Sequence, residues 1–215
     1  MELARRAGAG ASVSATQVSL TQKGKMRDGP DDPFMTFRAR QTIALARPEF
    51  RWRASTGPWG AIKVEDGLTQ GQGHIKVRLF GFLSVAEMGG GALLAKGEIM
   101  RYLAELAWAP DAMLANKSLI WNVRGPGKIT VGAGFGEARG EVQLQLGADG
   151  LIATVSGLRP RVEGKEVVER LWQGQFSDYR RHEGRQIPFH AEMGWQMDKR
   201  SFTVWRGDLT GWSLA

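Results

Sequence analysis

Arg101 and Glu105 are four residues apart, which is the spacing of an ion pair on one face of a helix. Glu98 lies one turn earlier and could pair with the same guanidinium group. A carboxylate beside an arginine inside a protein can orient a helix, hold the polar head of a ligand, or act as an acid or base. An enzyme using Glu105 could recruit Asp66 or Asp178, although Asp66 precedes a glycine-containing stretch and also has the pattern of a turn former.

Other patterns of catalytic or metal-binding residues are absent from the sequence. The histidines His74, His182 and His190 are not spaced as metal ligands, and there is no cysteine. The glycine-rich stretch 132–136 precedes a strand pattern, whereas a phosphate-binding loop requires a following helix. We therefore expect no metal ion and no cofactor.

Tryptophans are numerous, with eight in 215 residues. An indole ring is apolar but carries one N–H group that needs a partner, so many tryptophans lie at the wall of a cavity. Core packing is the ordinary role of such residues, and a pocket beside the charged stripe is the alternative that we pursue. The residues expected to line a ligand-binding pocket are Trp52, Arg101, Tyr102, Glu105, Trp108 and Trp121.

One long helical pattern would position these side chains. Ile99, Leu103 and Leu106 follow helical spacing, so residues 97–110 should form a helix that is apolar on nearly all sides and buried. Residues 110–115 should then form a second short helix, because Pro110 suits a first helical turn.

The remaining chain reads as β-strands with short turns. Residues 50–54 show the clearest alternation, with apolar side chains on one face and Arg51 and Arg53 on the other. We expect an α+β, mostly β fold: a curled antiparallel sheet, or half-barrel, of about eleven strands around the central helix and the short one. Residues 1–17 should form a partly flexible N-terminal segment and residues 18–215 a single domain.

The chain is basic, with a formal charge of +7. No nucleic-acid-binding motif is present, which argues against a nucleic-acid partner. Alternation predicts one basic outer face, which is either simply solvated or suited to an anionic membrane surface. Its residues are Arg38, Arg40, Arg51, Arg53, Lys63, Lys76 and Arg78. The first residues lack the apolar run of a signal peptide, so we expect a cytoplasmic protein.

Several motifs resemble those of a family of bacterial proteins of unknown function, and the resemblance covers about residues 18–209. The longest is Arg101-Tyr102-Leu103-Ala104-Glu105-x-x-Trp108-x-Pro110. The others are Phe37-x-Ala39-x-Gln41, Pro48-x-Phe50-x-Trp52-x-Ala54, Asp66 with Gly71-x-Gly73, Trp172-x-Gly174 and Asp178-Tyr179. The order of strands and helix is also similar to the half-barrel of periplasmic lipoprotein carriers, which implies a site for acyl chains against an internal helix.

Three functions are compatible with these patterns. The first is binding of an apolar or amphipathic small molecule between sheet and helix, with Arg101 or Glu105 holding its polar head. The second is an enzyme that uses Glu105 and Arg101 in the same cleft. The third is a homodimer or other interaction module, formed through strand edges or through Trp205 and Trp212 near the C-terminus.

Overall fold

A computed structural model describes residues 2–10, 14–164, 166–197 and 200–215. Residues 11–13 of the predicted N-terminal segment lie outside these ranges, as do residues 198–199, where the sequence predicts a hairpin turn. The helices are α1 (Glu2–Arg6), α2 (Ala92–Ala104) and α3 (Ala112–Ala115), with 3₁₀ turns at Pro58–Gly60 and Glu105–Ala107. The strands are β1 (Gln17–Met26), β2 (Met35–Ala44), β3 (Phe50–Thr56), β4 (Ile62–Thr69), β5 (Gln72–Leu79), β6 (Leu83–Gly89), β7 (Ile120–Gly125), β8 (Lys128–Phe135), β9 (Ala138–Leu146), β10 (Ile152–Glu163), β11 (Glu166–His182), β12 (Arg185–Gln196) and β13 (Ser201–Leu214).

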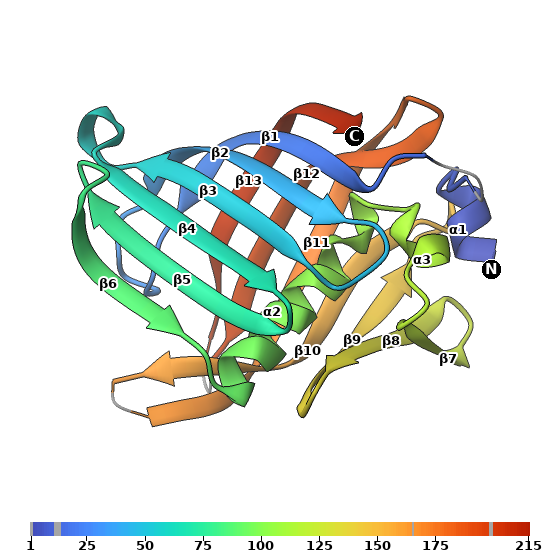
Figure 1. Cartoon of the computed structure of the whole chain (residues 1–215). Coiled ribbons are helices and arrows are strands. Elements are labelled where there is room, and N and C mark those ends of the chain that lie inside the picture. Colours follow the sequence, from blue (N-terminus) through green and yellow to red (C-terminus); the bar gives the residue numbers. More distant parts are fainter. Residues whose placement is uncertain (1, 11–13, 165, 198–199) are drawn as a thin grey trace.

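The described strands form one antiparallel sheet of thirteen strands, curled into a half-barrel (Figure 1). Strands β1 to β6 run in chain order to one edge of the sheet, and β7 to β13 run back from the other edge until β13 pairs with β1. The segment between β6 and β7 must therefore cross from edge to edge. It does so as α2, the adjoining 3₁₀ turn and α3, and α2 crosses the hollow of the sheet. The predicted fold class is confirmed, with thirteen strands instead of about eleven.

Helix α2 begins five residues earlier than the predicted helix, directly after the glycines that end β6. It gives way to the 3₁₀ turn at Glu105, and Asn116 caps the C-terminal end of α3. Ile99 and Leu103 are fully buried, as the helical spacing predicts. The sheet permits close approach at Gly140, where any side chain would overlap Ile99. In the described part of the chain, no helix has the length and apolarity needed to cross a membrane.

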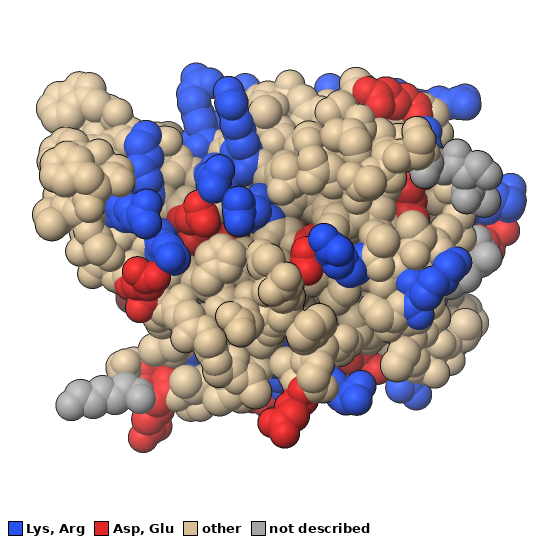
Figure 2. Space-filling model, in the orientation of Figure 1, with Lys and Arg blue, Asp and Glu red and all other residues tan. Residues whose placement is uncertain are grey.

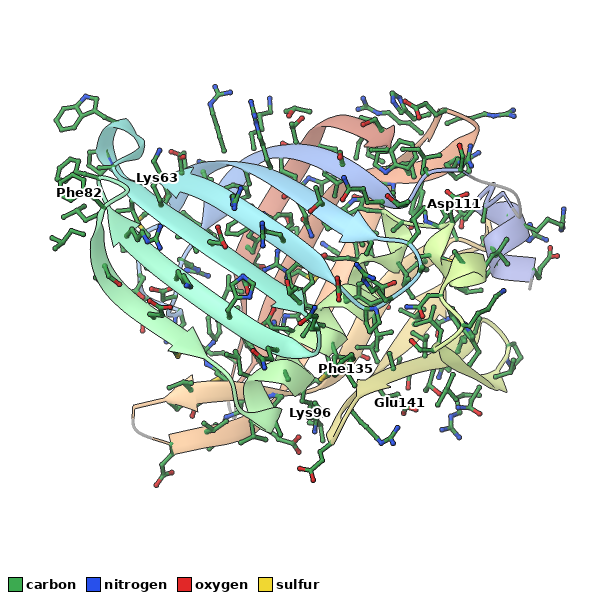
Figure 3. All side chains as sticks on the ribbon, in the orientation of Figure 1. Lys63, Phe82, Lys96, Asp111, Phe135 and Glu141 are labelled. Atoms are coloured by element: carbon green, nitrogen blue, oxygen red, sulfur yellow. The ribbon has the colours of Figure 1, made fainter. Side chains whose placement is uncertain are left out.

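The two walls of the half-barrel meet over α2. Phe135, at the end of β8, lies against Gly71 in the β4–β5 turn (Figure 3), and any side chain at Gly71 would overlap the Phe135 ring. Gly71 also has a positive φ of 73°, which glycine adopts without steric cost. The helix is thus enclosed by sheet on opposite sides.

The predicted basic face is confirmed by the strand register. Arg40 lies opposite Arg53, and Lys63 lies opposite Arg78, so these side chains share the convex surface. The sequence pattern predicts a single strand over residues 74–88, and this is wrong: these residues belong to β5 and β6, which a turn at Phe80–Phe82 separates. Gly81 marks this break, but the phenylalanines on either side of it are apolar and obscure the signal.

The N-terminal residues pack on the body of the protein. Ala4 in α1 is fully buried, and the Gly10 N–H donates to Asp111 at 2.9 Å. Asp111 also accepts two hydrogen bonds from Arg185 of β12, at 2.9 and 3.1 Å. This buried carboxylate therefore joins the N-terminal segment, the start of α3 and the sheet (Figure 3).

Candidate functional site

A cavity of about 240 Å³ lies between the helical segment and the concave face of the sheet. The helical side of its wall is formed by Arg101, Ala104, Glu105 and Trp108. One sheet wall, from β1 to β4, contributes Gln22, Gln41, Trp52 and Asp66, and the opposite wall, from β10 to β13, contributes Arg159, Trp172, Met193, Trp195, Val204 and Trp205. Met26, Arg27 and Asp28 border the cavity at the β1–β2 turn.

Arg101 is the centre of the charged groups in this wall. Its Nε donates to Glu105 at 2.9 Å, and its Nη1 donates to Asp66 of β4. Its guanidinium carbon lies 4.8 Å from the centre of the Phe50 ring and 5.3 Å from that of Trp52. Burial alone would lower the pKa of Arg101, but the two carboxylates raise it, so Arg101 stays charged.

Glu105 is held by a second group from the sheet. The Gln41 Nε2 donates to the carboxylate oxygen that Arg101 leaves free. Burial raises the pKa of Glu105, while Arg101 and Gln41 lower it. The predicted pair of Arg101 with Glu105 is confirmed.

Glu98 has a different partner from the predicted one. It pairs with Arg159 of β10 at 3.2 Å and not with Arg101. The Arg159 Nε also donates to the Gly97 carbonyl at 3.0 Å, and its guanidinium carbon lies 4.9 Å from the centre of the Trp172 ring. Arg159 therefore fixes the helix to the wall opposite the one that Arg101 contacts.

Burial shifts Glu98, like Glu105, toward the protonated form. Its burial, followed by the charge of Asp66, raises its pKa to about 8. Glu98 Oε2 and Asp66 Oδ1 are both buried, and neither accepts a hydrogen bond from any other described group of the protein. A hydrogen bond between the Glu98 and Asp66 side chains favours the protonated state of Glu98.

The raised pKa of Glu98 leads to a pH-dependence of stability. Because the unfolded carboxyl ionises near 4.5 and the folded one near 8, stability from this group is present below pH 4.5 and is lost as the pH rises toward 8. We expect Glu98→Gln to flatten the decline in the free energy of unfolding across this range. Urea denaturation of both proteins at several pH values measures the slope, and equal slopes would show that Glu98 does not titrate in this way.

Two further buried atoms in the wall have no hydrogen-bond partner. Gln22 accepts from Trp52 at 2.9 Å through its oxygen, which leaves its Nε2 donor unused. Gln41 uses its Nε2 on Glu105, which leaves its Oε1 acceptor unused. An unpartnered buried polar atom costs about 1–3 kcal/mol. Two residues that line the cavity thus carry one donor and one acceptor without a partner among the described residues.

Four of the six predicted pocket residues line this cavity: Trp52, Arg101, Glu105 and Trp108. Tyr102 does not, because adjacent helical residues point in different directions; its hydroxyl donates to the Ala44 carbonyl and accepts from Asn116.

Trp121 lies apart on β7, the edge strand at the far side of the sheet. Asp66 is within strand β4 and is not a turn former. It shares Arg101 with Glu105, because the guanidinium donates to both carboxylates. Asp178 does not line the cavity and pairs with Arg180 in an exposed position. Trp212 is buried and Trp205 faces the cavity, so neither forms an outer patch for a homodimer.

Gln22, Gln41 and Arg159 were missed as site residues, although the sequence carries a signal for each. Gln22 follows Val18 and Leu20 in alternation, and Gln41 lies between Ala39 and Ile43. A polar residue at an inward position of a strand points to a buried polar contact. The same reasoning applies to Arg159, four residues after the buried Val155.

Fold and site together define a half-barrel protein with an internal helix and, beside this helix, a cavity lined by charged and hydrogen-bonding side chains. The chain belongs to a family of unknown function, DUF6544, whose model matches residues 3–207. Comparison with curated protein sequences gave no match.

Solved structures with this fold include members of the LolA superfamily. A LolA-superfamily protein from Nitrosomonas europaea is similar with a TM-score of 0.54 and 8% identity, over 100% of this chain and 92% of that one. A putative outer membrane lipoprotein-sorting protein domain from Vibrio parahaemolyticus has a TM-score of 0.54 and 8% identity, over 99% and 89% of the chains. A DUF1329 family protein from Desulfovibrio piger has a TM-score of 0.55 and 12% identity, over 99% and 90%. These likenesses concern the fold alone.

Proposed function

We propose that the protein binds a small amphipathic molecule in the cavity, with an apolar chain against the tryptophans and an uncharged polar head at the two glutamines. The observation that carries the proposal is the unused donor of Gln22 together with the unused acceptor of Gln41 in one cavity wall. A hydroxyl, ester or amide group can pair with such atoms, and the free energy that it recovers would contribute to binding.

The charges in the wall favour a neutral head over an anionic one. Arg101 already holds Asp66 and Glu105, and Arg159 holds Glu98. An anionic head would have to displace one of these carboxylates, which would leave a buried charge without its partner.

The apolar part of the site is small. Trp108 lies edge-on to Trp205, with 6.2 Å between ring centres, and both rings border the cavity. Its volume of about 240 Å³ is below the 300–1,000 Å³ that is usual for small-molecule sites. A short or medium acyl chain therefore suits it better than a long one. The likeness in fold to a putative outer membrane lipoprotein-sorting protein domain supports an apolar ligand by analogy.

Filling the cavity tests this proposal. Val204 borders the cavity and is only partly buried, so Val204→Trp should place an indole in the space that the chain would occupy. We expect the affinity for a medium-chain monoacylglycerol to fall by about ten-fold or more, measured by titration calorimetry. Val204→Ala is the matched control, because it leaves the space open and should bind at least as tightly as the original protein.

The chemistry of the head is tested with ligands of one chain length. A monoacylglycerol and a primary amide should bind more tightly than the fatty acid or a lysophosphatidylglycerol. Unchanged affinity in a folded Val204→Trp protein would contradict the cavity as the binding site, and tighter binding of the anionic ligands would contradict the neutral head.

A further inference from the structure

The largest exposed apolar side chains gather at one end of the half-barrel. Trp59 is 100% exposed, Phe82 is 81% exposed and Phe80 is 65% exposed, and Leu83 lies next to them in the chain. We call these four residues the apolar tip. Trp59 belongs to the β3–β4 connection, and the other three lie at the β5–β6 turn. Each of the other seven tryptophans is buried or partly buried, so Trp59 alone of the eight is fully exposed.

Local structure holds the apolar tip together. The Phe80 N–H donates to the Ala61 carbonyl at 2.7 Å, which joins the two connections. The Phe80 and Phe82 rings stack with their centres 6.5 Å apart. Trp59 and Phe80 both have a φ of 52°, a backbone conformation that bulky side chains rarely adopt. These aromatic side chains therefore occupy strained positions without gaining burial, which favours a role outside the folding of the chain.

Figure 3 shows Phe82 at the extreme end of the molecule, with Lys63 close behind it. In Figure 2 the same end appears as protruding tan side chains beside a group of blue lysines and arginines. The tip thus projects from the body and does not form a flat or concave surface.

Cations without acidic partners lie directly behind the tip. Lys25, Arg38 and Lys63 share an outer groove with Trp59, and Arg78 lies opposite Lys63 on the neighbouring strand. None of these four cations forms a salt bridge with a described residue, whereas Arg53 and Lys76 on the same face are paired with Glu65 and Glu87. Positive charge without a salt-bridge partner therefore lies next to the aromatic side chains at this end.

We infer that this end docks on an anionic lipid bilayer, with the apolar tip inserted at the interface and the cations against the headgroups. A tryptophan that projects on a turn suits the boundary between headgroups and acyl chains. Lysines and arginines near the surface add attraction to anionic lipids. A protein partner would have to supply a deep apolar socket surrounded by acidic residues, whereas a bilayer offers both features without a specific shape.

Vesicle binding tests the inference with single substitutions at exposed positions. The original protein should sediment with vesicles that contain phosphatidylcholine and phosphatidylglycerol, and only weakly with phosphatidylcholine alone. Trp59→Ser and Phe82→Ser should each bind on the order of ten-fold more weakly. Lys63→Glu should lower binding by about five-fold or more, and added salt should have the same effect.

Val123→Ser is the matched control, because Val123 is 81% exposed, as Phe82 is, but lies on β7 at the opposite edge of the sheet. It should bind vesicles as the original protein does. So should Val204→Trp, because docking does not require an open cavity; the inference therefore stands or falls independently of the proposed ligand. Equal vesicle binding by Trp59→Ser and Val123→Ser would overturn it. It would also be overturned by light scattering that shows a dimer dissociated by Trp59→Ser, with no vesicle binding by the original protein.

Discussion

Replacing Arg101 with methionine should lower the free energy of unfolding by about 3–5 kcal/mol. The guanidinium of Arg101 is the shared partner of Asp66 and Glu105, which lie in the cavity wall with little exposure to solvent. Removal of this charge leaves two carboxylates that repel each other and have lost their counter-ion. Urea denaturation at neutral pH measures the loss.

Two comparisons separate this effect from the loss of any arginine. Arg53→Met removes an arginine that pairs with Glu65 on the exposed outer face, and it should cost about 1 kcal/mol or less. Adding Glu105→Gln to Arg101→Met should restore part of the stability, because the neutral amide needs no counter-ion and can still accept from Gln41. A loss in Arg101→Met no larger than that in Arg53→Met would contradict a central role for this ion cluster.

Replacing Trp108 with alanine should cost about 3–5 kcal/mol and should also abolish ligand binding in the cavity. The ring packs edge-on against Phe176 at 5.5 Å between centres, and its N–H donates to the Pro188 carbonyl at 3.0 Å. The Trp108 carbonyl accepts from the Trp212 indole at 2.8 Å. One residue thus joins the end of the helical segment to β11, β12 and β13.

Trp59→Ala is the control for Trp108, because it removes the same side chain from a fully exposed position. Its free energy of unfolding should stay within about 0.5 kcal/mol of the original value. Thermal unfolding followed by circular dichroism compares the two variants. Similar midpoints for both would show that the Trp108 contacts contribute little to stability.

The parts of the fold that could be predicted depend on local patterns. Alternation of apolar and polar residues identified most strands and the convex basic face, because side-chain direction in a strand is set by period two. Helical spacing around Ile99 and Leu103 identified the buried helix. The pairing of Arg101 with Glu105 was also within reach, because both residues lie on one helix.

The parts that could not be predicted depend on contacts between distant segments. Glu98 pairs with Arg159, 61 residues away, and no local spacing indicates this partner. The turn at Phe80–Phe82 contains Gly81, a usual turn residue, but its two phenylalanines are apolar and obscure the break between the strands. That the phenylalanines of this turn project into solvent is evident only from the three-dimensional structure.

The most direct test of the cavity as a ligand site is a crystal structure of the protein with a medium-chain monoacylglycerol. Our account predicts electron density in the cavity, with the glycerol head within hydrogen-bonding distance of Gln22 Nε2 and Gln41 Oε1 and the acyl chain against Trp108 and Trp205. Density for the ligand on the convex face, with the cavity between α2 and the sheet unchanged and without ligand, would contradict it.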